Sequence, residues 1–350
     1  MASILIRGGL LFDGDALSRK DIFTKDGKIA EIADEIDREA DFVCEANSQL
    51  VTPGLVDIHA HLRGLAPTAF GFPAELATLP FGVTAACDAG SSLGNRETLE
   101  ALPIGAVSLV AYSGDGERDD ARLAAYGERA IGIKVYYDTD LSPSVNAAYL
   151  EGACAYARER GLTVMVHCSN SPIPMSEIVT MLAPGDILTH TYHGGRHTAE
   201  EGDFAALRSA KEKGVLVDAG MAGHVHTDFG VLARCLAAGL APDTIGSDIT
   251  NFSAYTRGGR YGLTMCMSIA RRLGMSETAL LRAVTSTSAR AVGKGEAWGT
   301  LAVGRRADLA VLSYCDEGFS LTDRTGNHIE SNQGYRCLLT VLGGQVVYRH

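Results

Sequence analysis

Two histidines one residue apart, His59 and His61, follow the apolar run Val56-Asp57-Ile58. Alternate residues of a strand project to the same face, so a strand ending here would point both imidazoles at one place. Neutral imidazole nitrogens bind zinc and related ions, and two of them make half of such a site. The His-x-His spacing alone is as compatible with chance as with a metal site, so the rest of the chain must decide.

Four further polar residues close apolar segments later in the chain. Lys134 lies in AIGIKVYY, His167 ends LTVMVH, His190 ends DILTH and Asp248 ends DTIGSD. A charged or imidazole side chain at the end of a buried strand costs free energy unless it has a partner. A single buried histidine is more often a hydrogen-bonded core residue than a ligand. Six such residues in five separate segments favour one shared site over coincidence.

This set of side chains suits hydrolysis with two divalent ions. Four histidines, an aspartate and one anionic bridge would hold the ions about 3.5–4 Å apart. An ammonium would repel the ions, so Lys134 would act as a neutral amine or as a carbamate formed with carbon dioxide. A water bridging the ions would lose a proton near neutral pH and become the nucleophile. Asp248 could take the proton of the nucleophile and pass it to the leaving group.

The elements that must position these residues alternate between strand and helix from Pro53 onward. Amphipathic stretches such as 145–160, 199–213 and 229–238 have helical apolar spacing and are long enough to cross back to a parallel neighbour. Seven further strands follow the one before His59, at residues 82–89, 107–113, 130–137, 162–168, 186–192, 215–221 and 244–249. Eight strand and helix units predict a (β/α)8 TIM barrel, in which chemistry lies at the C-terminal ends of the strands.

Short strands are predicted at both ends of the chain. In the first 51 residues, Asp26-Gly27 separates two alternating runs and predicts a β-hairpin. Residues 301–312 and 338–348 have strand patterns beyond the barrel. We therefore expect a small β-sandwich of residues 1–51 and 297–350, with the barrel of residues 52–296 inserted between its halves.

Composition limits the class of partner. The net charge of −11 argues against nucleic acid or an anionic membrane as the main partner, because either needs a basic surface. The eight cysteines are scattered without a CxxC pair, as in reduced cytosolic proteins. No signal peptide or membrane-spanning run is recognisable. We expect a cytoplasmic protein with a small-molecule substrate, and a homo-oligomer.

The motifs together resemble a known family. PGLVDIHAH, the lysine in GIKVYY and the closing residues of VMVH, ILTH and IGSD are similar to the amidohydrolase superfamily, in its binuclear branch with a carboxylated lysine. GTLAVGRRADLAVLS (299–313) resembles the return of that family into its β domain. The resemblance implies two divalent ions, with zinc expected. It places the first on His59, His61 and Asp248, the second on His167 and His190, and a carbamate of Lys134 between them.

Placement within the superfamily rests on fewer residues. HAHLRG resembles the dihydroorotase motif, which implies that Arg63 binds a substrate carboxylate. The segments 82–95 and 222–224 resemble dihydroorotase-like deacetylases that act on small N-acyl or O-acyl carboxylates. The chain departs from both groups, because Tyr136 stands where the deacetylases tend to carry arginine and NFSAYTRGGR after Asp248 is not a recognisable dihydroorotase loop. The predicted substrate contacts are Arg63, Asn95, Tyr136, His224 and Arg257.

His224-Val225-His226 repeats the His-x-His spacing after the seventh predicted strand. These two histidines could form a substrate-contacting pair, but we expect one of them to be a supporting or loop residue and favour His224 as the contact.

Four functions remain open. The leading one is metal-dependent cleavage of the amide or ester bond of a small acylated amino or hydroxy acid through a metal-bridging hydroxide. The alternative is a cyclic amidohydrolase of the dihydroorotase or hydantoinase type. A mononuclear deaminase resembling this family would carry a glutamate three residues after His167, where this chain has Asn170, and it would leave Lys134 unused. A non-catalytic assembly protein would be expected to have lost ligands.

Overall fold

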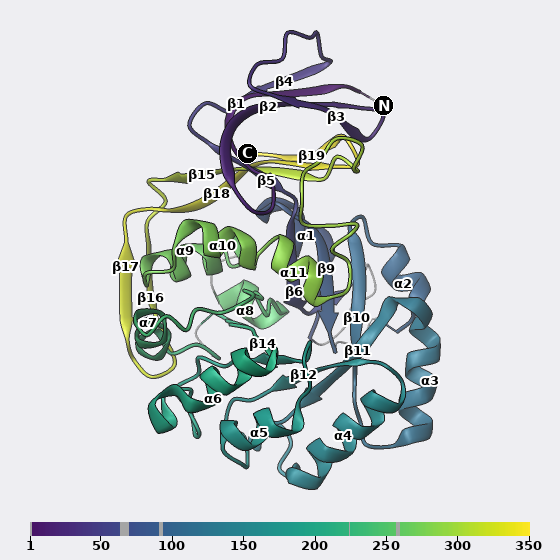
Figure 1. Ribbon diagram of the computed structural model, residues 1–350, viewed down its shortest axis with the longest axis vertical. Coiled ribbons are helices and arrows are strands. Elements are labelled where there is room, and N and C mark those ends of the chain that lie inside the picture. Colours follow the sequence, from purple (N-terminus) through teal and green to yellow (C-terminus); the bar gives the residue numbers. More distant parts are fainter. Residues whose placement is uncertain (1, 64–69, 91–93, 224, 257–259) are drawn as a thin grey trace.

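The computed structural model describes residues 2–63, 70–90, 94–223, 225–256 and 260–350. They form a barrel with helices around it and a β domain on top, in which both ends of the chain lie (Figure 1). The predicted (β/α)8 barrel with a β domain built from both chain ends is confirmed.

Seven parallel strands of the barrel are hydrogen-bonded in chain order. They are β6 (Leu55–Ala60), β9 (Val83–Ala89), β10 (Gly105–Ala111), β11 (Ala130–Tyr136), β12 (Thr163–His167), β13 (Ile187–Thr189) and β14 (Leu216–Val217). The predicted eighth strand is an extended segment that bridges Thr244 to Asp218 on one side and Ile249 to Ala60 on the other. This segment joins the last strand to the first and closes the barrel.

Helices cover the outside of the barrel, as the apolar spacing predicts. They are α1 (Ala74–Thr78), α2 (Arg96–Glu100), α3 (Gly116–Tyr126), α4 (Ala147–Glu159), α5 (Met175–Met181), α6 (Glu201–Lys213), α7 (Phe229–Ala237), α8 (Asn251–Thr256), α9 (Leu263–Arg272), α10 (Glu277–Ala283) and α11 (Ser286–Ala291). Side-chain caps define several starts. The Asn146 carboxamide accepts from the Tyr149 amide at the start of α4, and the Asp228 carboxylate accepts from the Val231 amide at the start of α7.

The β domain is one eight-stranded sheet in the order β19-β18-β15-β5-β1-β2-β3, with β4 also paired to β1. Its strands are β1 (Ile4–Phe12), β2 (Leu17–Lys25), β3 (Lys28–Ala33), β4 (Phe42–Glu45), β5 (Leu50–Pro53), β15 (Leu309–Cys315), β18 (Gly334–Leu342) and β19 (Gln345–Arg349). Asp26 and Gly27 form the predicted hairpin turn with φ of 51° and 78°. Strand β5 pairs with both β1 and β15. The chain then passes through Gly54 into β6, the first strand of the barrel.

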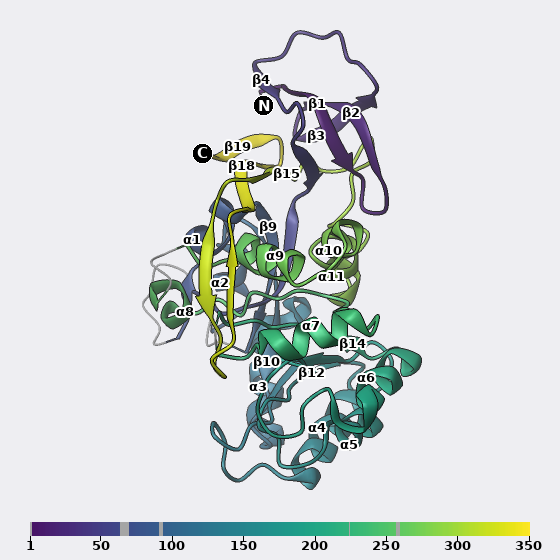
Figure 2. The ribbon, with the colours of Figure 1, turned by 90° about the vertical axis from the view of Figure 1, so that its left-hand side faces the viewer.

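A hairpin that sequence patterns did not predict leaves the β domain. Strands β15 and β18 pair as far as Cys315 and Gly334, and the chain between them forms β16 (Phe319–Thr322) and β17 (His328–Ser331). Figures 1 and 2 show this hairpin running from the β domain down the side of the barrel towards α7. The β domain thus reaches the rim of the barrel.

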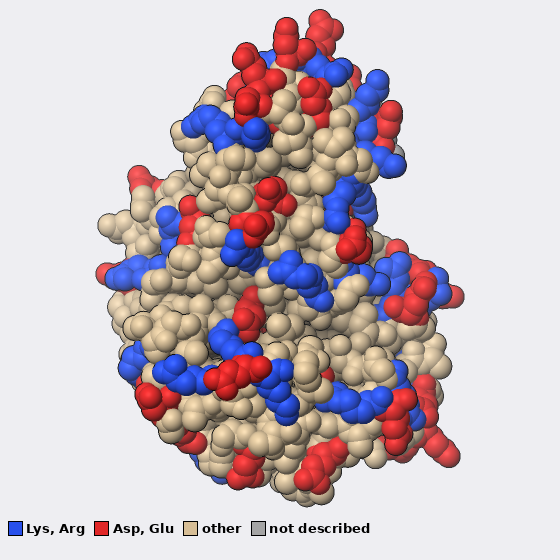
Figure 3. Space-filling model, in the orientation of Figure 1, with Lys and Arg blue, Asp and Glu red and all other residues tan. Residues whose placement is uncertain are grey.

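Basic and acidic side chains are interspersed over the face drawn in Figure 3, with acidic groups gathered on the outer tip of the β domain. Among the described residues, no helix is long and apolar enough to cross a membrane.

Candidate metal centre

The structure brings the six predicted ligands to one end of the barrel. His59 and His61 lie at the end of β6 and just beyond it, and both are buried. Asp248 lies in the segment that closes the barrel, where its Oδ1 is 2.9 Å from His61 Nε2 and 3.4 Å from His59 Nε2. Asp248 and His190 have φ of 50° and 62°, a left-handed backbone that costs free energy in residues other than glycine and often accompanies functional sites.

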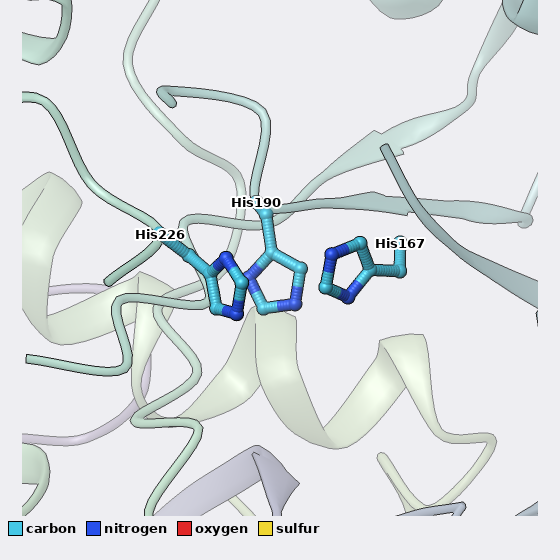
Figure 4. A group of neighbouring side chains, drawn as sticks. All are labelled: His167, His190 and His226. Carbon is cyan, nitrogen blue, oxygen red and sulfur yellow. The ribbon is translucent and has the colours of Figure 1, made fainter. Parts of the chain in front are cut away.

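A second group of imidazoles adjoins the first. The ring of His190 lies 4.2 Å from that of His167 and 4.2 Å from that of His226, between centroids (Figure 4). His167 ends β12, His190 follows β13 and His226 lies in the loop before α7. His226 was not among the predicted metal ligands. The sequence indicated only that it forms a second His-x-His pair with His224.

Lys134 lies beside the first group and lines the same cavity as both. Its Nζ is 3.0 Å from His59 Nε2 and 3.4 Å from the sulfur of Met165, and the side chain is fully buried. Burial lowers the pKa of Lys134 to about 8, against the opposing effect of the nearby Asp248 and Asp218 carboxylates. The neutral amine, which is the form that reacts with carbon dioxide, is therefore accessible near physiological pH.

Hydrogen bonds fix the tautomers of two of these histidines. The Thr189 hydroxyl donates to Asp218, so its oxygen accepts from Nδ1–H of His59 at 2.9 Å. His190 donates from Nδ1–H to the Gly220 carbonyl at 2.6 Å. In each ring the lone pair is left on Nε2, the nitrogen that faces Asp248. Such orienting partners are typical of histidines that bind metals.

The same reasoning applies to His167 and His226. Nε2 of His167 lies 3.2 Å from Oδ2 of Asp138 and 2.6 Å from the Ser169 hydroxyl, which itself donates to Asp138. Nδ1 of His226 is 3.3 Å from this hydroxyl oxygen. Because the Ser169 proton is used on Asp138, both imidazoles act as donors here, and each keeps its lone pair on its other nitrogen.

Burial also keeps these imidazoles neutral. It lowers the pKa of His59 and His190 well below the ordinary value, that of His167 to about 4 and that of His226 to about 3. A neutral imidazole is the form that binds a metal ion.

The donor set fits zinc-type ions. One atom each of His59, His190 and Asp248 lie within 4.8 Å of one another, as do one atom each of His167, His190 and His226. Nδ1 of His61 is buried and has no hydrogen-bond partner among the described residues. Nitrogen and carboxylate ligands in this number are what zinc and related ions prefer.

A cavity of about 340 Å³ opens over these residues. Its remaining described lining residues are Phe70, Tyr136, Asp138, Asp140, Leu141, Val225 and Arg324. Binding cavities for small molecules range from roughly 300 to 1,000 Å³, so this one suits a small substrate.

The predicted substrate contacts have different surroundings. Tyr136 lines the cavity, and its hydroxyl donates to the carbonyls of Ala89 and Gly90 at 3.3 Å each. Burial raises the pKa of Tyr136 well above its ordinary value, so this hydroxyl stays protonated. Asn95 caps α2, where its carboxamide oxygen accepts from the Thr98 amide at 3.0 Å.

Of the other three predicted contacts, the structure describes Arg63 alone. Arg63 lies half-buried in β7 (Leu62–Arg63), which pairs with β8 (Phe72–Pro73). His224 and Arg257 lie outside the described residues.

The fold and the donor set together define the class of a metal-dependent hydrolase built on a parallel barrel. The amidohydrolase family model matches residues 50–347, and the chain belongs to this family, as its motifs predicted. It is 26% identical to a deacetylase of Brucella anthropi over 92% of this chain and 86% of that protein. It is 27% identical to a dihydroorotase of Anaeromyxobacter dehalogenans, covering 99% of this chain and 98% of the other.

Solved structures support the fold. A dihydroorotase structure superposes with a TM-score of 0.86 at 23% identity, covering 99% of both chains. An adenine deaminase structure gives 0.83, also at 23% identity and over 99% of both chains. At this level of identity the likeness shows a shared architecture, and the choice among reactions must come from the site.

Proposed function

We propose that this amidohydrolase cleaves the amide or ester bond of a small acylated amino or hydroxy acid. The observation that carries the proposal is the meeting of His59, His61, Lys134, His167, His190 and Asp248 at the base of one small cavity. A deaminase with a single ion would have no use for the buried amine of Lys134 beside His59.

Two zinc-type ions fit the two groups of donors. His59, His61 and Asp248 would hold the first ion, and His167, His190 and His226 the second. Lys134, as its carbamate, would lie between them. When bound, the ions supply a hydroxide at neutral pH and polarise the carbonyl that is attacked.

The protein's own residues position and move the proton. Asp248 takes a proton from the attacking water as the new C–O bond forms, and it returns that proton to the leaving nitrogen or oxygen as the bond of that atom to the acyl carbon breaks. His61, whose Nε2 lies 2.9 Å from Oδ1 of Asp248, orients this carboxylate. Tyr136, held by two carbonyls, contributes an ordered wall of the cavity beside Lys134.

The substrate class follows from cavity size and relatives. A cavity of about 340 Å³ has room for one small acylated acid. Relatives named deacetylase cover most of the chain. A cyclic amide of the dihydroorotase or hydantoin type is the second candidate, because relatives named dihydroorotase match the chain over almost its whole length.

A substrate panel tests the proposal. Zinc-loaded protein would be incubated with N-acetyl amino acids, O-acetylated hydroxy acids and cyclic ureides, and the released acid or amine measured. Turnover of acetylated acids with little opening of cyclic ureides is the expected result. Preference for the cyclic ureides would contradict the proposal and favour a cyclic amidohydrolase instead. The Asp248→Asn protein is the control for background hydrolysis.

A further inference from the structure

An arginine from the β domain reaches the active-site cavity. Arg324 lies in the loop between β16 and β17 and is one of the residues that line the cavity. Among the described lining residues, the lysine and arginine side chains are Lys134 and Arg324. Lys134 is fully buried beside the ligands, whereas the Arg324 side chain is 52% exposed. Arg324 therefore presents a positive charge at the mouth, away from the donors at the base.

The hairpin holds Arg324 in place through anchors on both sides of it. Oδ2 of Asp323 accepts from the amide of Phe229 at 2.7 Å, at the start of α7. The Thr325 hydroxyl donates to Oδ2 of Asp228 at 2.5 Å, and the Asn327 carboxamide donates to Oδ1 of Asp228 at 3.1 Å. Asp323 is buried, so its bond to the Phe229 amide is shielded from water. The backbone of Arg324 is thus fixed against the barrel rim.

The present partner of Arg324 leaves its charge available to a ligand. Its guanidinium lies 3.8 Å from Oδ2 of Asp140, whose side chain is 64% exposed. That same oxygen already accepts from the Asn170 carboxamide at 2.9 Å. A long, exposed ion pair contributes little free energy, and a carboxylate that binds the guanidinium with both oxygens gains more.

Apolar side chains stand at the same mouth. Phe70 and Leu141 line the cavity with 48% and 58% of their surface exposed, and Val225 also lines it. Exposed apolar groups around a cavity with a few polar anchors are typical of a small-molecule site. A ligand with a carboxylate at one end and an apolar side chain would satisfy both features.

We propose that Arg324 binds the free carboxylate of the substrate, and that the β16–β17 hairpin thereby selects acylated acids with an apolar side chain over neutral acylated amines. The inference rests on the proposed function and names the substrate class of the same site. The acyl group would lie at the base of the cavity next to Asp248, and the carboxylate at the mouth next to Arg324.

The test compares an acid with its carboxamide in binding and in turnover. The binding ligands are the ketone isostere of N-acetylleucine, in which CH2 replaces the amide NH so that it resists hydrolysis, and the carboxamide of that isostere. Calorimetry with zinc-loaded wild type and Arg324→Gln measures both. We expect the acid to bind wild type roughly 10- to 100-fold more tightly than the carboxamide, the range of charge-assisted hydrogen bonds, and Arg324→Gln to abolish that preference.

Further variants separate charge from folding. Arg324→Lys should recover part of the preference. Arg234→Gln removes another exposed arginine that pairs with a carboxylate, Glu200, and should keep the wild-type preference. The zinc content and melting temperature of Arg324→Gln should match wild type. Equal binding of acid by wild type and Arg324→Gln, or an equal loss for acid and carboxamide, would overturn the inference.

Turnover of N-acetylleucine and its carboxamide distinguishes the two proposals. If neither compound nor any other acetylated acid in the panel releases acetate, the proposed function is refuted. Calorimetry still decides the role of Arg324 in that case. Turnover of both compounds with equal kcat/KM by wild type and Arg324→Gln leaves the hydrolase in place and removes Arg324 from recognition.

Discussion

The hydroxyl of Thr325, in the loop of the β16–β17 hairpin, donates a hydrogen bond of 2.5 Å to Oδ2 of Asp228, which caps α7. This bond links the β domain to the rim of the barrel across 97 residues of sequence. Thr325 directly follows Arg324, which lines the cavity, so this bond helps to hold Arg324 in position.

Removing this bond should weaken substrate binding and leave the predicted metal-binding residues unchanged. Thr325→Val keeps the shape of the side chain but loses the hydroxyl, and a hydrogen bond of this kind contributes about 1 kcal/mol. We expect KM for acetylated acids to rise several-fold while kcat stays close to wild type. Thr322→Val, in the same hairpin and without a bond to Asp228, is the matched control. A fall in kcat with unchanged KM would contradict the expectation.

His226 should be required for one ion of the pair. Removing an imidazole that is close to both His167 and His190 should lower the affinity for one ion at least about tenfold, a loss of 1.4 kcal/mol, and leave the other in place. Metal analysis of His226→Ala after dialysis against a graded chelator series would measure this. His197→Ala serves as control, because His197 pairs with Glu201 instead. Retention of both ions with wild-type affinity would exclude His226 as a ligand.

Lys134 should be essential through its amine. Lys134→Ala should lose more activity than the roughly 10- to 100-fold expected for a residue that only supports a ligand. Wild type incubated with ¹³C-bicarbonate should show a carbamate resonance by NMR, and Lys134→Ala should lack it. A wild-type spectrum without that resonance would leave Lys134 as a neutral amine ligand and remove the carbamate from the site.

Metal removal should destabilise the fold. The ligands are buried, and an ion that binds only the folded state stabilises it by about 2.7 kcal/mol at a hundredfold excess over its Kd. The melting temperature should therefore fall with a chelator and rise again with added zinc in a concentration-dependent way. Identical melting curves with and without chelator would show that no tightly bound ion supports the fold.

Thiol reactivity should follow burial. Burial raises the pKa of Cys154 to about 11 and that of Cys235 to about 12, so at pH 8 almost none of either thiol is the reactive thiolate. Alkylation of native protein at pH 8, read by peptide mass spectrometry, should be confined to the half-buried Cys44 and Cys315. Reactivity at Cys154 and Cys235 should rise as the pH increases towards their pKa values. Rapid labelling of both at pH 8 would contradict the buried positions.

The sequence by itself predicted a barrel from the order of its strands and helices, and it placed six polar residues at strand ends; the resemblance of its motifs indicated the family. Eight apolar strands with helices between them favour a closed parallel barrel, and that architecture places strand ends such as His167 and His190 on one rim. The barrel and the strand-end positions depend on local periodicity and on spacing within single segments, which a linear sequence displays directly.

Only the tertiary structure decided what the loops and the hairpin contribute. Asn95 follows a strand of the barrel, as the predicted metal ligands do, yet its carboxamide caps α2. The fold brings His226 within 4.2 Å of His190 between ring centroids, and Arg324 lines the cavity in a loop that Thr325 and Asn327 tie to Asp228. Contacts between distant segments depend on packing and loop closure, and no pattern around residue 324 carries that information.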